Sequence, residues 1–546
     1  MNNKLLAMYD IRGIQDYIFR TTKLRDAIGA SAIVEDILSN ALEVAVKSAR
    51  EQGKQFSCEL EWEDEANGRS KEFRAEDEKD VQVLYIGGGN AFVTYRDIDL
   101  CRAINRLMSK YVIEATYSLQ LAIAVTEITG DYSEDNKKVN MKMSRAKADM
   151  SESSPVGALP VMDIELASGL PLSADCRDRI TNEPLSKETA MKRDAEWDKR
   201  KRIKLKKLDN LIEEKGTDST LAVVHIDGNN MGLRIRALMD GEREYVSAVN
   251  KIRRISYSIN HSFKDVFEDM VRYFNASQDR EINMLKVIAA GDDITYICTA
   301  KAAIASVEYF VNNITKRSIT GNPDDLDQYG FSICAGIAYI RSHFPFSIGY
   351  QVAEACCESA KSRAKNAKTG NKVGNFFDYQ FCKNVQTQNI KAIRKNEYKS
   401  PSGEYLMLRP YEIGGDTPRP YNFENLRMSL AEFVKLKDDS SKKGDADQKT
   451  LPRKHAKAIR NTYSLGRAQM SVLKSFLESR GWKLPGQKGS EIEFYLEKLK
   501  LDEEERGYTA KYYDALELMD DYIDLKDFEK KDDNNAEEEI KRDETV

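Results

Sequence analysis

Hydrophobic positions follow the same order twice along the first 380 residues. In the first run, a short apolar strand (about 5–9) precedes a long helical stretch (14–49). A glycine-rich strand–turn–strand (81–95), a helix (102–114), a strand (119–128) and a last helix (144–150) follow. The second run repeats this order at about 221–226, 246–274 and 285–298, then with a helix, and then at about 330–340 and 352–367. Two units with one order of elements, offset by roughly 215 residues, indicate an internal duplication.

Each run predicts the order β-α-α-β-β-α-β-α, which is an antiparallel sheet backed by helices, of ferredoxin-like or palm type. Beyond residue 380 the pattern becomes irregular and then mainly helical. We therefore expect an α+β protein with two palm domains and a mainly helical C-terminal domain. The predicted domains are a first palm (1–155), a linker with a basic helix (156–217) and a second palm (218–380). The helical domain (381–530) and an acidic disordered tail (531–546) follow.

Composition excludes several classes of protein. Hydrophobic residues make up 41% of the 546 residues, which excludes wholesale disorder. The chain has no apolar run of about 18 residues, which argues against a membrane partner, and its first residues do not read as a signal peptide. The eight cysteines form no CxxC pair, which argues against a disulfide framework and a zinc site. A reducing cytoplasm is the expected location.

The candidate catalytic residues of the second unit are three carboxylates. Asp227 ends the first strand of that unit, and Asp292 and Asp293 stand at the tip of its hairpin. Neighbouring strands bring these residues to one sheet edge, where the like charges repel unless a cation neutralises them. Oxygen ligands favour Mg²⁺ or Mn²⁺, and two such ions suit phosphoryl transfer. A Gly-Asp-Asp sequence alone is also typical of an ordinary hairpin turn. The metal-site prediction therefore depends on its combination with Asp227 at the end of the neighbouring strand.

Small and amide residues around the carboxylates indicate a phosphate site. Gly291 lets the hairpin turn tightly and lets a nucleotide approach the backbone. The turn Gly228–Asn229–Asn230 opens a helix near Met231, whose free N–H groups suit a triphosphate. We therefore expect a nucleotide to bind between this turn and the hairpin.

The motifs of the second unit resemble a known family. HIDGNNMG, AGDDITYI, SICAGIAYI and AEACCESAKSRAK are similar to the catalytic palm of the large polymerase-like subunit of type III CRISPR effector complexes. YDIRGIQDYIF, KLRDAIGASAIVEDIL and YIGGGNAFV resemble the first, degenerate palm of the same subunit. Diguanylate cyclases are more distant relatives. The resemblance covers most of residues 1–380 and, more weakly, the C-terminal region.

This resemblance implies a nucleotidyltransferase that joins ATP into cyclic oligoadenylates as an antiviral signal. It implies metal ligation by Asp227, Asp292 and Asp293, together with Ile226, and contacts of Lys361 and Lys365 with the triphosphate. The first palm keeps Asp10 but lacks the hairpin carboxylates, so we expect it to be catalytically silent. Its turn residues Gly88 and Gly89 are expected to cradle a second nucleotide across the palm–palm interface.

Three features depart from the family pattern. Asn229 replaces the second Asp of the Asp-x-Asp motif, and Ala290 replaces the first Gly of GGDD. The four histidines include no His-Asp dipeptide, and the chain begins directly at the first palm, so we expect no HD nuclease domain. Cys176 stands alone in the segment that resembles a reduced zinc knuckle, so no zinc is expected there.

Two alternative functions remain open at this stage. Basic stretches at 200–207 and 453–467 fit RNA phosphates, which favours a non-catalytic structural or RNA-docking subunit of a CRISPR-type ribonucleoprotein. A dinucleotide cyclase that uses GTP is the second alternative. The expected partners are thus an NTP, above all ATP, and RNA, ribonucleoprotein subunits or further copies of the chain.

Overall fold

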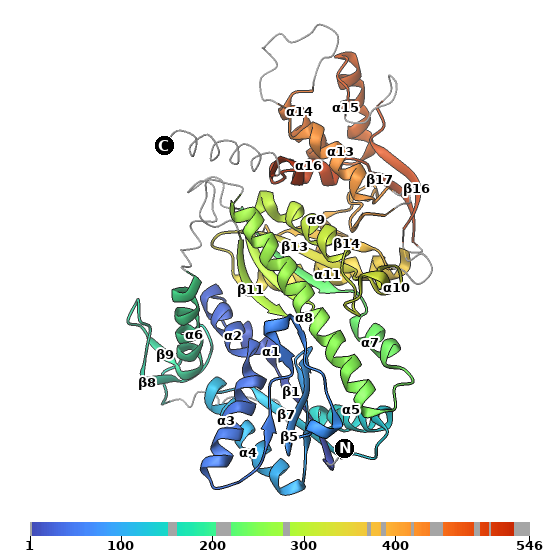
Figure 1. Cartoon of the computed structure of the whole chain (residues 1–546). Coiled ribbons are helices and arrows are strands. Elements are labelled where there is room, and N and C mark those ends of the chain that lie inside the picture. The colour runs from blue at the N-terminus through green and yellow to red at the C-terminus, as the bar shows by residue number, and fades with distance from the viewer. Residues whose placement is uncertain are drawn as a thin grey trace, which may run out of the picture.

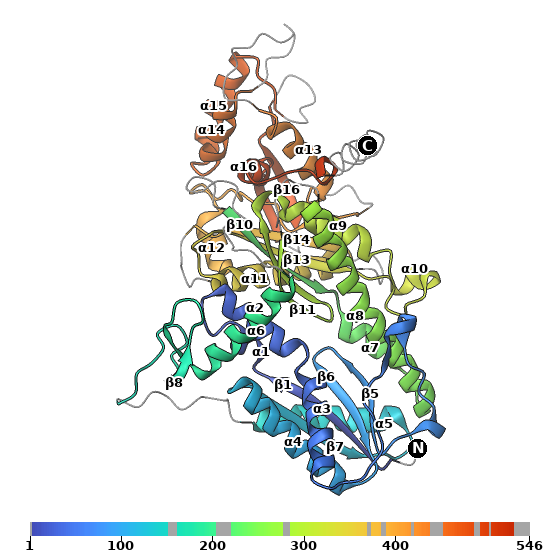
Figure 2. The ribbon, with the colours of Figure 1, turned by 60° about the vertical axis from the view of Figure 1, so that its left-hand side comes forward.

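The structure is a computed structural model of the whole chain, shown in Figure 1. The residues it describes are 3–150, 161–203, 220–276, 284–367, 373–383, 389–415, 420–436, 451–484, 492–501 and 504–528. Both views place the first unit at one end, the second unit in the middle and the C-terminal region at the other end (Figures 1 and 2). Among the described residues, no helix combines the length and apolar character needed to cross a bilayer.

The first unit is a five-stranded sheet with helices around it. Its strand order is β2-β5-β6-β1-β7, with bounds Cys58–Glu59, Val81–Gly87, Asn90–Tyr95, Leu5–Arg12 and Gln120–Glu127. The central strand β1 is antiparallel to β6 and to β7, and it is buried because Leu5–Tyr9 are all apolar. The helices are α1 to α5, at Ile14–Ile18, Leu24–Glu35, Ile37–Glu51, Ile98–Thr116 and Tyr132–Asp149. A small hairpin of β3 and β4 follows β2, at Glu63–Asp64 and Arg69–Ser70.

The second unit repeats this plan with more strands. Its order is β11-β12-β10-β13-β14-β15, with bounds Met284–Ala290, Asp293–Thr299, Thr220–Gly228, Ile333–Arg341, Asn375–Phe381 and Tyr411–Ile413. The helices are α7 to α11, at Met231–Met239, Tyr245–Ala276, Ala303–Ile314, Leu326–Tyr329 and Phe346–Ala367. Both units thus show the predicted order of elements, and the α+β prediction is confirmed. The sheet does not end at residue 380, because β14 pairs with the later strand β15.

The linker packs against the first unit through a close helix–helix contact. It contains β8 (Leu172–Arg177), β9 (Pro184–Ser186) and α6 (Lys187–Ile203). A Cβ on Gly29 would lie 1.7 Å from the backbone oxygen of Lys192, so only glycine allows α2 to approach α6 this closely. Arg193 joins the buried carboxylates of Asp26 and Asp178, which holds the segment around Cys176 in place. The rest of the predicted basic helix, from residue 204 on, lies outside the described residues.

The C-terminal region contains helices and one two-stranded sheet. The helices α12 to α16 are Ile390–Glu397, Phe423–Phe433, Arg453–Tyr463, Arg467–Ser479 and Tyr513–Leu518. The antiparallel strands are β16 (Tyr495–Leu501) and β17 (Glu504–Ala510). Arg409 joins this region to the second unit, because its buried guanidinium lies over Tyr379 and binds Asp514 and Glu517. The acidic tail predicted at 531–546 lies outside the described residues.

The long helix α8 runs from the second unit to the sheet of the first (Figures 1 and 2). Its residue Arg253 is almost completely buried and donates hydrogen bonds to the backbone oxygens of Leu84, Lys71 and Val83. Strand β5 has an irregular register at these residues, between Val83 and Tyr85. The guanidinium therefore satisfies carbonyl groups that the irregular ladder leaves available, and it ties the two units together.

We predict that Arg253→Ala lowers the free energy of unfolding by about 3 kcal/mol, because three buried carbonyl groups lose their donor. Urea unfolding followed by circular dichroism measures this change. The neighbouring Arg254→Ala serves as the control, because Arg254 is exposed on the same helix. Equal stabilities for the two variants would contradict the coupling role of Arg253.

Candidate active site

The pairing of β10 with β12 brings the three predicted carboxylates together. Ile226 faces Ile294 across this antiparallel pair, so the next residue, Asp227, lies beside Asp293. Asp292 precedes β12 and reaches Gly228, where an added Cβ would lie 2.8 Å from the Asp292 Oδ2 atom. Gly291 turns the hairpin with a φ of +63°, a conformation that favours glycine. The strand register alone therefore gathers Asp227, Asp292 and Asp293 at one sheet edge.

Burial and mutual repulsion change the protonation of these carboxyl groups. Burial raises the pKa of Asp292 to about 6, and the nearby charge of Asp227 adds to this effect. Burial also raises the pKa of Asp293 to about 8, with further contributions from Asp227 and Asp292. The pKa of Asp227 is raised by burial as well, although the ammonium of Lys361 acts in the opposite direction. The cluster thus takes up protons readily, as crowded carboxylates do without a bound cation.

Lys361 of α11 is the cation nearest to the cluster. Its Nζ atom donates a hydrogen bond to Asp227 Oδ2 at 2.5 Å, and it lies 3.2 Å from Glu358 Oε1. Burial acts against the charged form, yet the bond to Asp227 and the charge of that residue raise the pKa of Lys361 above its usual value. The second predicted lysine, Lys365, lies one helical turn further along and lines a cavity beside the turn after β10. Among the described residues, the structure therefore brings Lys361, and not Lys365, into contact with a carboxylate of the cluster.

The turn after β10 has the predicted conformation, but Asn229 points away from the carboxylates. Its side-chain amide donates to the backbone oxygen of Gly374, and its backbone N–H donates to Ser332. An aspartate here would set a carboxylate against a carbonyl oxygen, which explains the amide at this position. Asn230 has a left-handed conformation, with a φ of 55°, and immediately precedes α7. Ile226 is fully buried among apolar residues, so only its backbone oxygen is available as a ligand.

Some residues of the site were not predicted from the sequence. The Nδ1 atom of His225 lies 3.3 Å from Asp293 Oδ1 and 3.1 Å from Thr295 Oγ1. Burial, and then the charge of Lys361, lower the pKa of His225 to about 4, so its ring is neutral at neutral pH. The alternation of side chains along a strand places His225 on the same face as Asp227 two residues later, and this signal was available in the sequence.

An aromatic contact connects the site to the first unit. Tyr350 of α11 meets the ring of His225 edge-on, at 5.6 Å between centroids. Tyr350 also stacks on Phe19, with centroids 3.9 Å apart. Phe19 follows α1 of the first unit, so Tyr350 connects the packing of the two units to the carboxylate site.

The first unit contains a reduced copy of this site. Asp10 of β1 forms an ion pair with Lys147 of α5, which corresponds to the pair of Asp227 and Lys361. Asp10 faces Asn90 across β1 and β6, so an amide occupies the position of the third carboxylate. Gly88 and Gly89 form the tip of this hairpin, with φ values of +60° and +77°. The first unit thus keeps one acid–lysine pair and lacks both hairpin carboxylates.

The donor atoms of the second unit fit a hard divalent cation. Oδ1 of Asp293 is buried and, among the described residues, accepts no hydrogen bond. At the same time, no three His, Cys, Asp or Glu side chains of the described residues are arranged as a ready metal site. Asp227 is instead paired with Lys361 through its Oδ2 atom. The chemistry of the three groups fits Mg²⁺ or Mn²⁺ once Asp227 turns towards its neighbours.

Residues 220–369 match the family model of the Cas10/Cmr2 second palm domain. No curated protein sequence matches the chain. This domain match spans β10 to α11, and so it contains all three carboxylates and both lysines.

Similar solved structures share low identity with the chain. A Csm1–Csm4 cassette in complex with cA4 is 13% identical, with a TM-score of 0.39, over 66% of this chain and 53% of that chain. The apo Csm1–Csm4 cassette is 15% identical, with a TM-score of 0.40, over 67% and 53%. A Csm1–Csm4 subcomplex of the type III-A CRISPR-Csm interference complex is 15% identical, with a TM-score of 0.40, over 67% and 54%.

The chain spans about half the length of these similar chains. Residues 220–369 are thus similar to the second palm domain of Cas10/Cmr2, as the resemblance of their motifs predicted.

Proposed function

We propose that the chain is a nucleotidyltransferase that makes cyclic oligonucleotides, with ATP as the substrate. The observation that supports this proposal is the meeting of Asp227, Asp292 and Asp293 at one edge of a palm sheet, beside Lys361. ATP as substrate, and cyclic oligoadenylate as an antiviral signal, follow from the family resemblance. Cyclisation of GTP into a dinucleotide is the alternative within the same chemistry.

In the proposed reaction, the 3′-hydroxyl of one nucleotide attacks the α-phosphorus of a second. A new O–P bond forms, the bond from the α-phosphorus to the bridging oxygen breaks, and pyrophosphate leaves with that electron pair. The hydroxyl proton is lost to water. Two Mg²⁺ or Mn²⁺ ions, when bound, supply Lewis acidity and offset the charge of the phosphates. Asp227, Asp292 and Asp293 are proposed as their ligands, with the backbone oxygen of Ile226.

The remaining predicted residues are proposed to hold the nucleotides. Gly228 and Gly291 are proposed to lie against the phosphates, and Asn230 immediately precedes α7, whose first N–H groups have no partner within the helix. Lys361 is proposed to exchange Asp227 for a phosphate oxygen, since an ammonium binds both. In the first palm, Gly88 and Gly89 are proposed to cradle the second nucleotide, with no chemistry of their own.

We predict that Asp292→Asn together with Asp293→Asn lowers the rate of product formation at least about 100-fold, because the charge that holds the cations is lost. Labelled ATP with Mn²⁺, followed by chromatography for oligonucleotide and pyrophosphate, measures this rate. Glu268→Gln serves as the control, because Glu268 is an exposed acid on α8. A double variant that remains folded and turns over ATP at the wild-type rate would show that the site is assigned wrongly.

The raised pKa values predict how stability depends on pH. Asp292 and Asp293 have pKa values of about 6 and about 8 in the fold, against about 4 in an unfolded chain. Between pH 4 and pH 8 these two carboxyl groups therefore hold more protons in the native state than in the unfolded state. Their contribution to the free energy of unfolding falls as the pH rises through this range when no metal is present.

We expect chemical unfolding at a series of pH values to show this fall in the wild type and a flatter profile in the double Asn variant. Millimolar Mg²⁺ should restore stability at pH 8, since a ligand of the native state stabilises it. The same slope in both proteins, or no effect of Mg²⁺ at pH 8, would argue against a cation site formed by these carboxylates.

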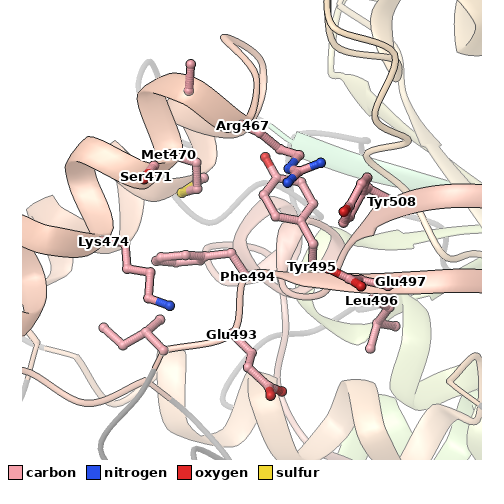
Figure 3. A pocket seen from close by; sticks show the side chains of 12 residues that line it. Arg467, Met470, Ser471, Lys474, Glu493, Phe494, Tyr495, Leu496, Glu497 and Tyr508 are labelled. Atoms are coloured by element: carbon pink, nitrogen blue, oxygen red, sulfur yellow. The ribbon is translucent and has the colours of Figure 1, made fainter.

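A second candidate function, RNA docking, is favoured by a cavity in the C-terminal region. This cavity of about 830 Å³ lies between α15 and the pair β16–β17. Figure 3 shows Arg467 and Lys474 on the helix side, the rings of Phe494 and Tyr495 at the base, and Glu493 and Glu497 along the strand. The Arg467 guanidinium lies 3.6 Å above the ring of Tyr508. Aromatic faces beside basic groups are the chemistry that holds single-stranded RNA.

If RNA docks here, Arg467→Glu should weaken binding of a single-stranded 20-nucleotide RNA and lower the salt slope by about one phosphate contact. Filter binding at several salt concentrations measures both quantities. Lys264→Glu makes the same charge change on the exposed face of α8 and serves as the control. Equal affinities for the two variants would remove RNA docking at this cavity from consideration.

A further inference from the structure

The buried histidine His225 lies beside the carboxylate cluster and has no part in the proposed reaction. It is 4% exposed, and it lies directly opposite Thr295 in the register of β10 and β12. Because side chains alternate along a strand, Asp227 shares one face of the sheet with His225. Asp293, two residues before Thr295, lies on the same face. A histidine thus belongs to the polar surface on which two of the three carboxylates stand.

The two oxygen atoms of Asp293 have different surroundings. Oδ1 is buried, accepts no hydrogen bond among the described residues, and lies 3.3 Å from Nδ1 of His225. The Asp293 side chain as a whole is 38% exposed, so its solvent-facing part lies on the Oδ2 side. A buried carboxylate oxygen without a donor is costly, and an imidazole N–H at this distance can supply that donor. One oxygen of Asp293 therefore faces the histidine, and the other faces the open site.

Packing holds the ring of His225 from two sides. Within the sheet, Oγ1 of the completely buried Thr295 lies 3.1 Å from Nδ1. From helix α11, the buried Tyr350 meets the ring edge-on, and Phe19 of the first unit stacks on Tyr350. Close packing of this kind leaves the imidazole little freedom to turn, so Nδ1 stays beside Asp293.

We propose that His225 is a positioning residue for the cation site: its Nδ1–H donates to Oδ1 of Asp293 and leaves the Oδ2 side of that carboxylate for Mg²⁺ or Mn²⁺. The inference rests on the proposed function, because it takes Asp293 as a metal ligand. Carboxylates that bind metals are themselves held by hydrogen bonds, and loss of such a partner typically costs roughly 10–100-fold in metal affinity. Through Tyr350, the stacking of Phe19 makes the first palm part of the same support.

The test measures Mn²⁺ binding by the full chain with electron paramagnetic resonance, both without nucleotide and with α,β-methylene-ATP. We expect His225→Leu, which keeps an apolar side chain of similar size but has no donor, to weaken Mn²⁺ binding about tenfold. His225→Asn should bind Mn²⁺ almost as the wild type does, because the amide nitrogen of asparagine takes the place of Nδ1. His343→Leu makes the same substitution at an exposed position after β13 and is the matched control.

Phe19→Ala tests the contribution of the first palm without changing any residue of β10. We expect a smaller loss of Mn²⁺ affinity than in His225→Leu, since Tyr350 keeps its place in α11 but loses its stacking partner. If Phe19 acts through the histidine, adding Phe19→Ala to His225→Leu weakens Mn²⁺ binding no further. Thermal unfolding of each variant shows whether the fold is retained, and Phe19→Ala keeps the test decisive if His225→Leu does not fold.

The outcomes separate this inference from the proposed function. Equal Mn²⁺ affinity in the wild type and His225→Leu, equal losses in His225→Leu and His225→Asn, or no Mn²⁺ binding by the wild type would each overturn the role of His225. Formation of product from ATP alongside any of these results would leave the proposed function intact. If His225→Leu weakens Mn²⁺ binding, His225→Asn restores it, and no nucleotide is ever joined, the inference stands and the proposed transferase function fails.

Discussion

Repulsion among three carboxylates at one sheet edge is the constraint on which the second palm depends. The antiparallel pairing of β10 with β12, in the register that sets Ile226 opposite Ile294, makes Asp227 and the hairpin carboxylates Asp292 and Asp293 neighbours. Only one ammonium, that of Lys361, contacts the cluster among the described residues. The pKa values of all three acids are raised, because their negative charges are buried close together with one positive charge beside them. A cluster of this kind gains stability from any cation that joins it, which links folding of the palm to its chemistry.

The first palm meets the same constraint in a different way. It keeps an acid–lysine pair, Asp10 with Lys147, but it carries Gly89 and Asn90 where the second palm has Asp292 and Asp293. With one carboxylate and one ammonium, its site has no excess charge to offset. The duplicated chain therefore has one site with excess negative charge, in the second palm, and one site with balanced charge, in the first palm. Phe19, Tyr350 and Arg253 hold the two palms together, so the site with excess charge is built on an interface rather than on one unit alone.

The sequence predicted the repeated order of elements and the carboxylate cluster, because both follow from local periodicity and strand register. Contacts between residues far apart in the chain could not be predicted from the sequence. Arg253 binds carbonyl groups of β5, about 170 positions earlier in the chain, and nothing near Arg253 marks them. The short strand β15 joins the sheet about 30 residues after the predicted end of the palm, and three residues give no periodic signal. The motif shows only that Asn229 replaces an aspartate, and nothing near Asn229 in the sequence indicates that its amide donates to Gly374.

The most direct test of the account is a crystal structure of the chain grown with Mn²⁺ and α,β-methylene-ATP, recorded with anomalous scattering from manganese. The account predicts anomalous density within ligand distance of Asp227, Asp292 and Asp293, with Asp227 turned away from Lys361. It would be contradicted by a nucleotide bound elsewhere, with no manganese at these carboxylates and with Asp227 still paired to the lysine.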